Sequence, residues 1–166
     1  SIYEQLGIVH GKTVTISQLN NILSSRNSLY NLWKIICGKQ TLPEHLAIEK
    51  SLQTLSEILT TFQVLQDARQ IGLTYSQQAD FYQVLGQFTK ALGLREQETA
   101  IFEKSGYAHE LLVSRAKLAM LLWQINAQQH QAETFELLSL ALAEAQRMQI
   151  PEAKQIEEIR EQMGIA

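Results

Sequence analysis

Apolar residues recur every three or four positions along most of this chain, a spacing that places them on one side of an α-helix. Short stretches containing glycine, asparagine or proline interrupt the pattern. The pattern predicts seven or eight helices and no strand. The predicted helices cover residues 9–24, 28–37, 75–92, 95–104, 108–125, 132–148 and 151–163. The expected turns lie at Gly7, Gly11, 38–43, Gly72, Gly93, Gly106, 126–129 and 149–151.

The segment 43–71 allows two interpretations. Its apolar period continues without a breaker, which favours one long helix starting at Pro43. However, the text ISQLNNIL at Ile16 matches residues 52–59 at an offset of 36, which favours a helix pair with a turn near Thr60 and Thr61. Both interpretations remain open from the sequence.

An internal repeat organises the chain. Residues 2–23 align without a gap with residues 101–122, at an offset of 99, and the alignment places His10 on His109. This offset is close to three units of about 34 residues, the length at which helix pairs stack into solenoids. We therefore expect an array of antiparallel helix pairs.

The last predicted helix has the features of a cap on such an array. Pro151 stands at its first position and Gly164 at its expected C-cap. Ile156, Ile159 and Met163 form one narrow apolar stripe, and the rest of the helix is strongly charged. A terminal repeat needs such a polar outer side because it has no neighbour there.

The segments resemble the tetratricopeptide (TPR) repeat family. Tyr82, Leu85 and Gly86 in YQVLG match the core of the family's first helix, and Leu118 and Ala119 match its leucine-small pair. Other family positions are filled by Leu19, Phe102, Leu138 and Ala141. Several positions depart from the family pattern, and residues 36–53 carry hardly any motif.

The resemblance implies a single all-α domain over residues 1–166, degenerate around 36–53. It implies a right-handed superhelical solenoid of antiparallel helix pairs, with a capping helix at 151–163. Leu19, Leu85, Leu118 and Leu122 are then expected to be buried between helices.

The resemblance also implies a non-catalytic module that binds a protein or peptide partner in a concave groove lined by the first helices. The groove candidates carried over from the family are Ser17, Asn21, Gln83, Gln87, Lys90, Lys117, Met120, Trp123 and Gln124. This polar surface suits hydrogen bonds to an extended backbone or contact with a mildly acidic helix. The alternative is a sensor or spacer segment of a larger signalling or regulatory protein.

Composition narrows the classes of partner. A net charge of -3 and the scattered basic residues give no stripe that would neutralise phosphates, so no nucleic-acid partner is expected. No apolar stretch approaches the roughly 20 residues that span a bilayer, so no membrane partner is expected. The single cysteine, Cys37, favours a cytoplasmic setting. The start at Ser1, within a repeat, suggests a fragment of a larger protein.

No residue pattern predicts catalysis, a cofactor or a metal. The histidines at 10, 45, 109 and 130 lack the spacing that places two ligands on one helix face. Cys37 is expected to be a buried apolar cysteine, not a nucleophile. Trp33 is expected in the core because it shares a face with Leu29 and Ile36, whereas Trp123 can face either the core or the groove.

Overall fold

The computed structural model of this protein describes residues 16–25, 27–37 and 45–165. These residues form eight α-helices and no strand, which confirms the all-α prediction for the described part of the chain. None of these helices combines the length and the apolar character needed to cross a membrane. The helices are α2 (Ile16–Ser24), α3 (Ser28–Cys37), α4 (His45–Leu65), α5 (Ala68–Val84), α6 (Phe88–Ser105), α7 (Ala108–Asn126), α8 (Gln131–Met148) and α9 (Glu152–Met163).

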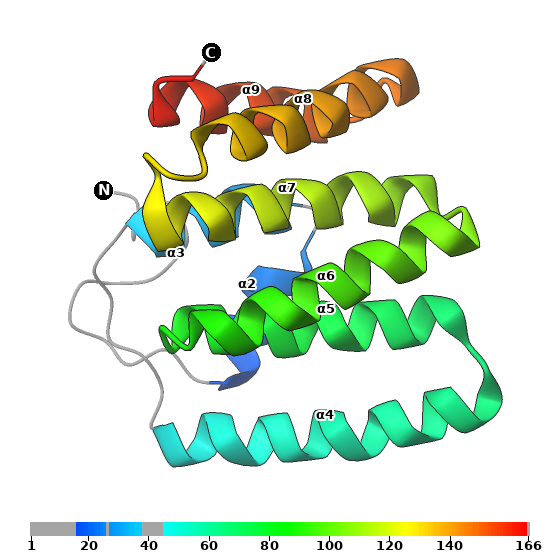
Figure 1. The fold of residues 1–166 in the computed structure, drawn as a ribbon. Helices are drawn as coiled ribbons and strands as arrows, with labels where there is room; N and C mark the ends of the chain where they lie inside the picture. Colours follow the sequence, from blue (N-terminus) through cyan, green and yellow to red (C-terminus); the bar gives the residue numbers. More distant parts are fainter. Residues whose placement is uncertain (1–15, 26, 38–44, 166) are drawn as a thin grey trace.

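Helices α4 to α9 follow one another through the molecule, and each packs against the next (Figure 1). The odd-numbered helices α5, α7 and α9 run in the same direction (Figure 1). Helices α2 and α3 lie behind this row, where α2 contacts α5 and α3 contacts α7 and α9. The N-terminal helices therefore pack beside helices that follow them by 40 to 130 positions in the chain.

The segment 43–71 is divided between two helices, so the helix pair is the correct interpretation within the described residues. The turn lies at Gln66 and Asp67, not at the threonines near 60. Gln66 adopts a φ of 55°, and the Asp67 carboxylate accepts a hydrogen bond from the Gln70 N–H at 3.1 Å. An aspartate N-cap of this kind starts a helix by satisfying a free backbone donor.

Two glycines predicted as turns lie inside helices. Gly72 is in α5 and Gly93 is in α6, so the predicted boundaries at 75–92 and 95–104 were wrong. The turn between these helices is at Gly86, which has a φ of 76°. The text YQVLG therefore covers the end of α5 and this turn, not the middle of a helix, and Leu85 is only partly buried.

Gly72 has a packing role. A Cβ atom on Gly72 would lie 2.5 Å from Cε1 and Cζ of Phe102, so the bare Cα of α5 gives room for this aromatic ring of α6. A Cβ atom on Gly93 would meet nothing within 4 Å. Gly72 is therefore required for helix packing, whereas Gly93 is not, although both lie inside helices.

The C-terminal half agrees closely with the predicted helices. Helices α7, α8 and α9 begin and end within one residue of the predicted bounds. Gly164 closes α9 with a φ of 74°, which confirms its predicted role as a C-cap. Ile156 and Ile159 are fully buried, and Met163 is nearly so, as their stripe predicted.

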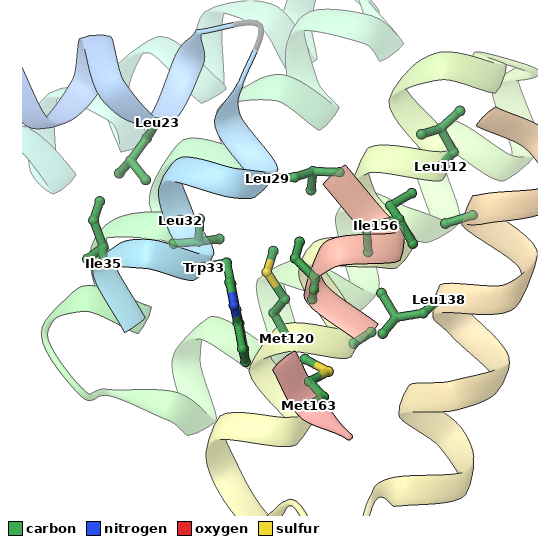
Figure 2. Packing of buried hydrophobic residues seen from close by; sticks show 14 of the residues in the cluster. Leu23, Leu29, Leu32, Trp33, Ile35, Leu112, Met120, Leu138, Ile156 and Met163 are labelled. Carbon is green, nitrogen blue, oxygen red and sulfur yellow. The ribbon is translucent and has the colours of Figure 1, made fainter. Parts of the chain in front are cut away.

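The hydrophobic core continues from this half into α2 and α3. Figure 2 shows Trp33 pointing from α3 toward Met120 of α7 and Met163 of α9. Its burial confirms the predicted core position of Trp33. Cys37, at the end of the same helix, is exposed, so its predicted burial was wrong. It follows Ile36, which is the last residue of α3 to pack against the core.

Candidate functional site

Side-chain pairs join α5 to α7 at a regular spacing. The partners in each pair are 41 residues apart, and successive pairs are seven residues apart, which is about two helical turns. The pairs are Arg69–Glu110 at 2.8 Å, Ser76–Lys117 at 3.4 Å and Gln83–Gln124 at 2.9 Å. The offset of 41 residues between the paired positions of α5 and α7 is longer than the unit of about 34 that the sequence repeat indicated.

A buried cluster of four charged residues lies between α5, α6 and α7. The Arg95 guanidinium donates to Asp80 and, at 3.1 Å, to Oε2 of Glu98. The Lys117 ammonium donates to Oδ2 of Asp80 at 3.1 Å. Arg95 is 0% exposed and Glu98 1% exposed. Ions removed from water in this way persist only when they are well paired, and this cluster balances two cations with two carboxylates.

Among the influences on the pKa of Glu98, a member of this cluster, desolvation is the largest. Burial raises the pKa of the Glu98 carboxyl, although Arg95 and Lys117 favour its charged form. Only one of its oxygens, Oε2, accepts a hydrogen bond from another residue in the described part of the chain. Within the described cluster, the fully buried atom that lacks a hydrogen-bond partner is Nε of Arg95.

A cavity of about 660 Å³ lies beside this cluster. Asp80, Glu98 and Lys117 reach it from α5, α6 and α7. Helix α4 contributes the apolar side chains Leu55, Ile58 and Phe62. The cavity thus has both a charged side and an apolar side.

Helices α2 and α3 form another wall of this cavity and continue onto α9. Leu23, at the end of α2, and Ser28, at the start of α3, line the cavity. Farther along α3, Trp33 Nε1 donates to Gln162 Oε1 of α9 at 2.6 Å. We call the surface formed by α5, α7 and α9 the α5/α7/α9 face. Helix α3 contacts all three of its helices.

The structure brings three of the predicted groove residues together. Gln83, Lys117 and Gln124 all belong to the pairs that join α5 and α7. Lys117 is buried, and Met120 belongs to the hydrophobic core. Trp123 is partly buried and packs against that core.

The other predicted groove residues lie elsewhere. Gln87 is the N-cap of α6, and Lys90 follows in its first turn, where its ammonium is 5.3 Å from the centre of the Tyr82 ring. Ser17 and Asn21 are exposed on α2, and Ser17 lines a second cavity of about 430 Å³. The nine predicted residues therefore do not form one continuous stripe. Their role in binding stays a prediction.

The sequence prediction missed Arg95, Glu98 and Ser76. One signal could have found the first two. The buried positions of α6 are Ala91, Arg95, Glu98 and Phe102, so two charged residues stand on an apolar helical stripe. Charged residues at such positions are buried only when they have partners.

The described residues contain no group of three or more histidine, cysteine, aspartate or glutamate side chains that could hold a metal ion. Their ionisable groups instead tie helices together, as when His109 Nε2 lies 2.9 Å from Glu152 Oε1 of α9. Comparisons with protein-family models, curated proteins and solved structures gave no match. The TPR resemblance thus stays a prediction.

Proposed function

We propose that this chain is a non-catalytic, TPR-like interaction module whose α5/α7/α9 face binds a partner helix. In this proposal, α4 to α9 form a right-handed solenoid of helix pairs, and α9 caps it. The α5/α7/α9 face is then the concave side, because the first helix of each pair lines it.

The packing of α2 and α3 carries the proposal. These helices present an amphipathic surface to the α5/α7/α9 face, and their buried anchors are Leu29, Leu32 and Trp33. A large aromatic residue with one hydrogen bond is the kind of anchor that dominates helix-in-groove binding. The contact within the chain supports a partner that presents a similar helical surface.

The polar groups of the face favour a helix over an extended peptide. An extended backbone needs free donors and acceptors along the groove. Here the Gln83 amide donates to Gln124, and the Lys117 ammonium is engaged by Asp80 and Ser76. Because these groups satisfy one another, apolar anchoring of a helix is the stronger mode.

The test uses a labelled peptide of residues 16–37, added to the whole chain. In the native protein the chain's own helices compete at the high effective concentration of a tethered segment. Trp33→Ala should weaken that competitor, so we expect the variant chain to bind the native peptide at least about tenfold more tightly than the native chain does. Fluorescence anisotropy measures both dissociation constants.

Two controls complete the test. Phe135→Ala also removes an aromatic ring, but from an exposed position on α8, and should leave peptide binding as in the native chain. A peptide that itself carries Trp33→Ala should bind the variant chain more weakly than the native peptide. If the native peptide binds neither chain, the α5/α7/α9 face is no helix-binding surface.

The second candidate is a sensor or spacer segment of a larger regulatory protein. The observation that favours it is the cover that α2 and α3 already give to the α5/α7/α9 face. In that case Trp33→Ala should lower the free energy of unfolding of the whole chain without creating a binding site. Chemical unfolding together with the peptide titration separates the two candidates.

A further inference from the structure

The cavity between α2, α4, α5 and α7 has the dimensions of a small-molecule site. Its volume of about 660 Å³ falls within the range of about 300–1,000 Å³ that is typical of ligand pockets. Such pockets are mainly apolar, with a small number of polar groups that fix the orientation of the ligand. This cavity has that composition.

The apolar lining comes from several helices. Five helices and the turn between α8 and α9 contribute it, so a ligand body would be enclosed from different directions. The residues are Leu23, Leu55, Ile58, Phe62, Leu73, Phe102, Val113 and Ile150. Binding of an aliphatic or aromatic group against this surface would be favourable, because it removes apolar area from water.

The polar side has one carboxylate oxygen that is available for a ligand. Glu98 is 1% exposed and lines the cavity, and its Oε2 is held by Arg95. Its other oxygen, Oε1, has no hydrogen-bond partner among the described residues. This second oxygen can therefore accept a hydrogen bond from a donor group of a ligand in the cavity.

The charges around the cavity favour a cation. Four carboxylates line it, those of Asp80, Glu98, Glu110 and Glu152. The basic lining residues are Arg69 and Lys117, and Arg95 lies behind Glu98. Among the described residues that line the cavity, carboxylates therefore outnumber Arg and Lys side chains by four to two.

We propose that this cavity binds a small amphipathic amine. Its ammonium group donates to Oε1 of Glu98, and its apolar body lies against Ile58 and Phe62 of α4. The attraction between this ammonium and the carboxylate is weakly screened by salt, because Glu98 is buried. The cavity is lined in part by residues of the α5/α7/α9 face, but amine binding in it does not require a partner helix.

A bound ligand would also hold α2 in place. Leu23, Ser24 and Ser25 of the α2–α3 segment line the cavity. A ligand that contacts these residues binds only when α2 is packed in its observed position. It therefore stabilises that packing by mass action. Slower hydrogen exchange of the α2 amides in the presence of ligand is the expected sign.

The test compares three probes with the same apolar body: 4-phenylbutylamine, 4-phenylbutanoate and 4-phenyl-1-butanol. Calorimetric titration of the whole chain should give saturable binding of the amine, at least about tenfold tighter than that of the carboxylate, with the alcohol between them. Glu98→Gln should remove most of this preference. The proposal is overturned if the amine and the carboxylate bind with equal affinity. It is also overturned if the amine does not bind up to about 10 mM, which is close to the weakest affinity that titration resolves.

Charge changes on α4 test the site without touching the buried cluster. Ile58 lines the cavity and is 40% exposed, so the fold should tolerate Ile58→Lys and Ile58→Glu. The lysine should weaken amine binding and the glutamate should strengthen it. Val64, 78% exposed on the same helix and outside the cavity lining, provides the matched Lys and Glu controls, which should change nothing. If the Ile58 pair and the Val64 pair behave alike, the amine does not bind in this cavity.

Discussion

Replacing Gly72 by alanine tests how α5 packs against α6. The added methyl group would lie 2.5 Å from two carbons of the Phe102 ring, which is well inside van der Waals contact. The ring belongs to a side chain that is 1% exposed, so it has little room to move away. Alanine otherwise suits the middle of a helix better than glycine does.

Two opposing effects set the size of the change. Overpacking a well-filled core costs about 1–3 kcal/mol. The better helix propensity of alanine returns about 0.5–1 kcal/mol. We therefore expect Gly72→Ala to lower the free energy of unfolding by about 1 kcal/mol, because overpacking outweighs the gain in helix propensity.

Gly93→Ala is the matched control. It makes the same chemical change in the middle of α6, where the new methyl group meets nothing within 4 Å. It should raise the free energy of unfolding by about 0.5–1 kcal/mol. Because both variants gain the same helix propensity, the difference between them measures the overpacking alone.

Urea unfolding followed by circular dichroism gives both free energies, provided that the dependence on urea is the same in each variant. Phe102→Leu completes a double-mutant cycle, in which Gly72→Ala should be less harmful once the ring is gone. If Gly72→Ala stabilises the chain as much as Gly93→Ala does, the packing of Phe102 on Gly72 is not as described.

Three further predictions concern the core and the charged cluster. Leu118→Ala should lower the free energy of unfolding by about 2–5 kcal/mol, and a loss below about 0.5 kcal/mol would show that Leu118 is not in the core. Trp33→Phe keeps the aromatic body but loses the hydrogen bond to Gln162, so it should cost about 0.5–1.5 kcal/mol in urea unfolding; no loss would mean that this bond does not form. Burial raises the pKa of Glu98 above its ordinary 4.5, so the contribution of this group to stability is complete below 4.5 and is lost as the pH rises through the folded-state value. The free energy of unfolding of the native chain relative to Glu98→Gln should therefore fall as the pH rises above 4.5, and a constant difference would contradict the raised pKa.

The sequence predicted the C-terminal helices well because two signals coincided there. Turn residues flank the apolar periods of α7, α8 and α9, as Gly106 does before α7 and Gly164 does after α9. In α5 and α6 the signals diverged. Gly72 interrupts the composition of α5 without ending the helix, because its role is to admit the Phe102 ring. A contact of this kind depends on how a second helix packs, so the pattern within one helix cannot reveal it.

The candidate site was predictable only in part. Gln83 of α5 hydrogen-bonds to Gln124 of α7, and Lys117 of α7 hydrogen-bonds to Ser76 of α5. The partners in both pairs are 41 residues apart, a spacing that the offset of 99 between the sequence repeats did not indicate. The role of Arg95 required the spatial approach of Asp80 from α5, which no local period indicates.

Locking α3 onto the α5/α7/α9 face tests whether that face is the helix-binding surface. Asn27 Oδ1 lies 3.3 Å from Gln155 Nε2, so cysteines at these two positions can be joined by a short bismaleimide, with Cys37→Ser preventing side reactions. The dissociation constant of the residue 16–37 peptide is measured for the Trp33→Ala chain that carries these changes, before and after cross-linking. We predict that cross-linking weakens peptide binding at least about tenfold, because the tethered helix then retains the face. Equal binding by the open and the cross-linked chain would contradict the proposal that α3 and a partner helix use the same surface.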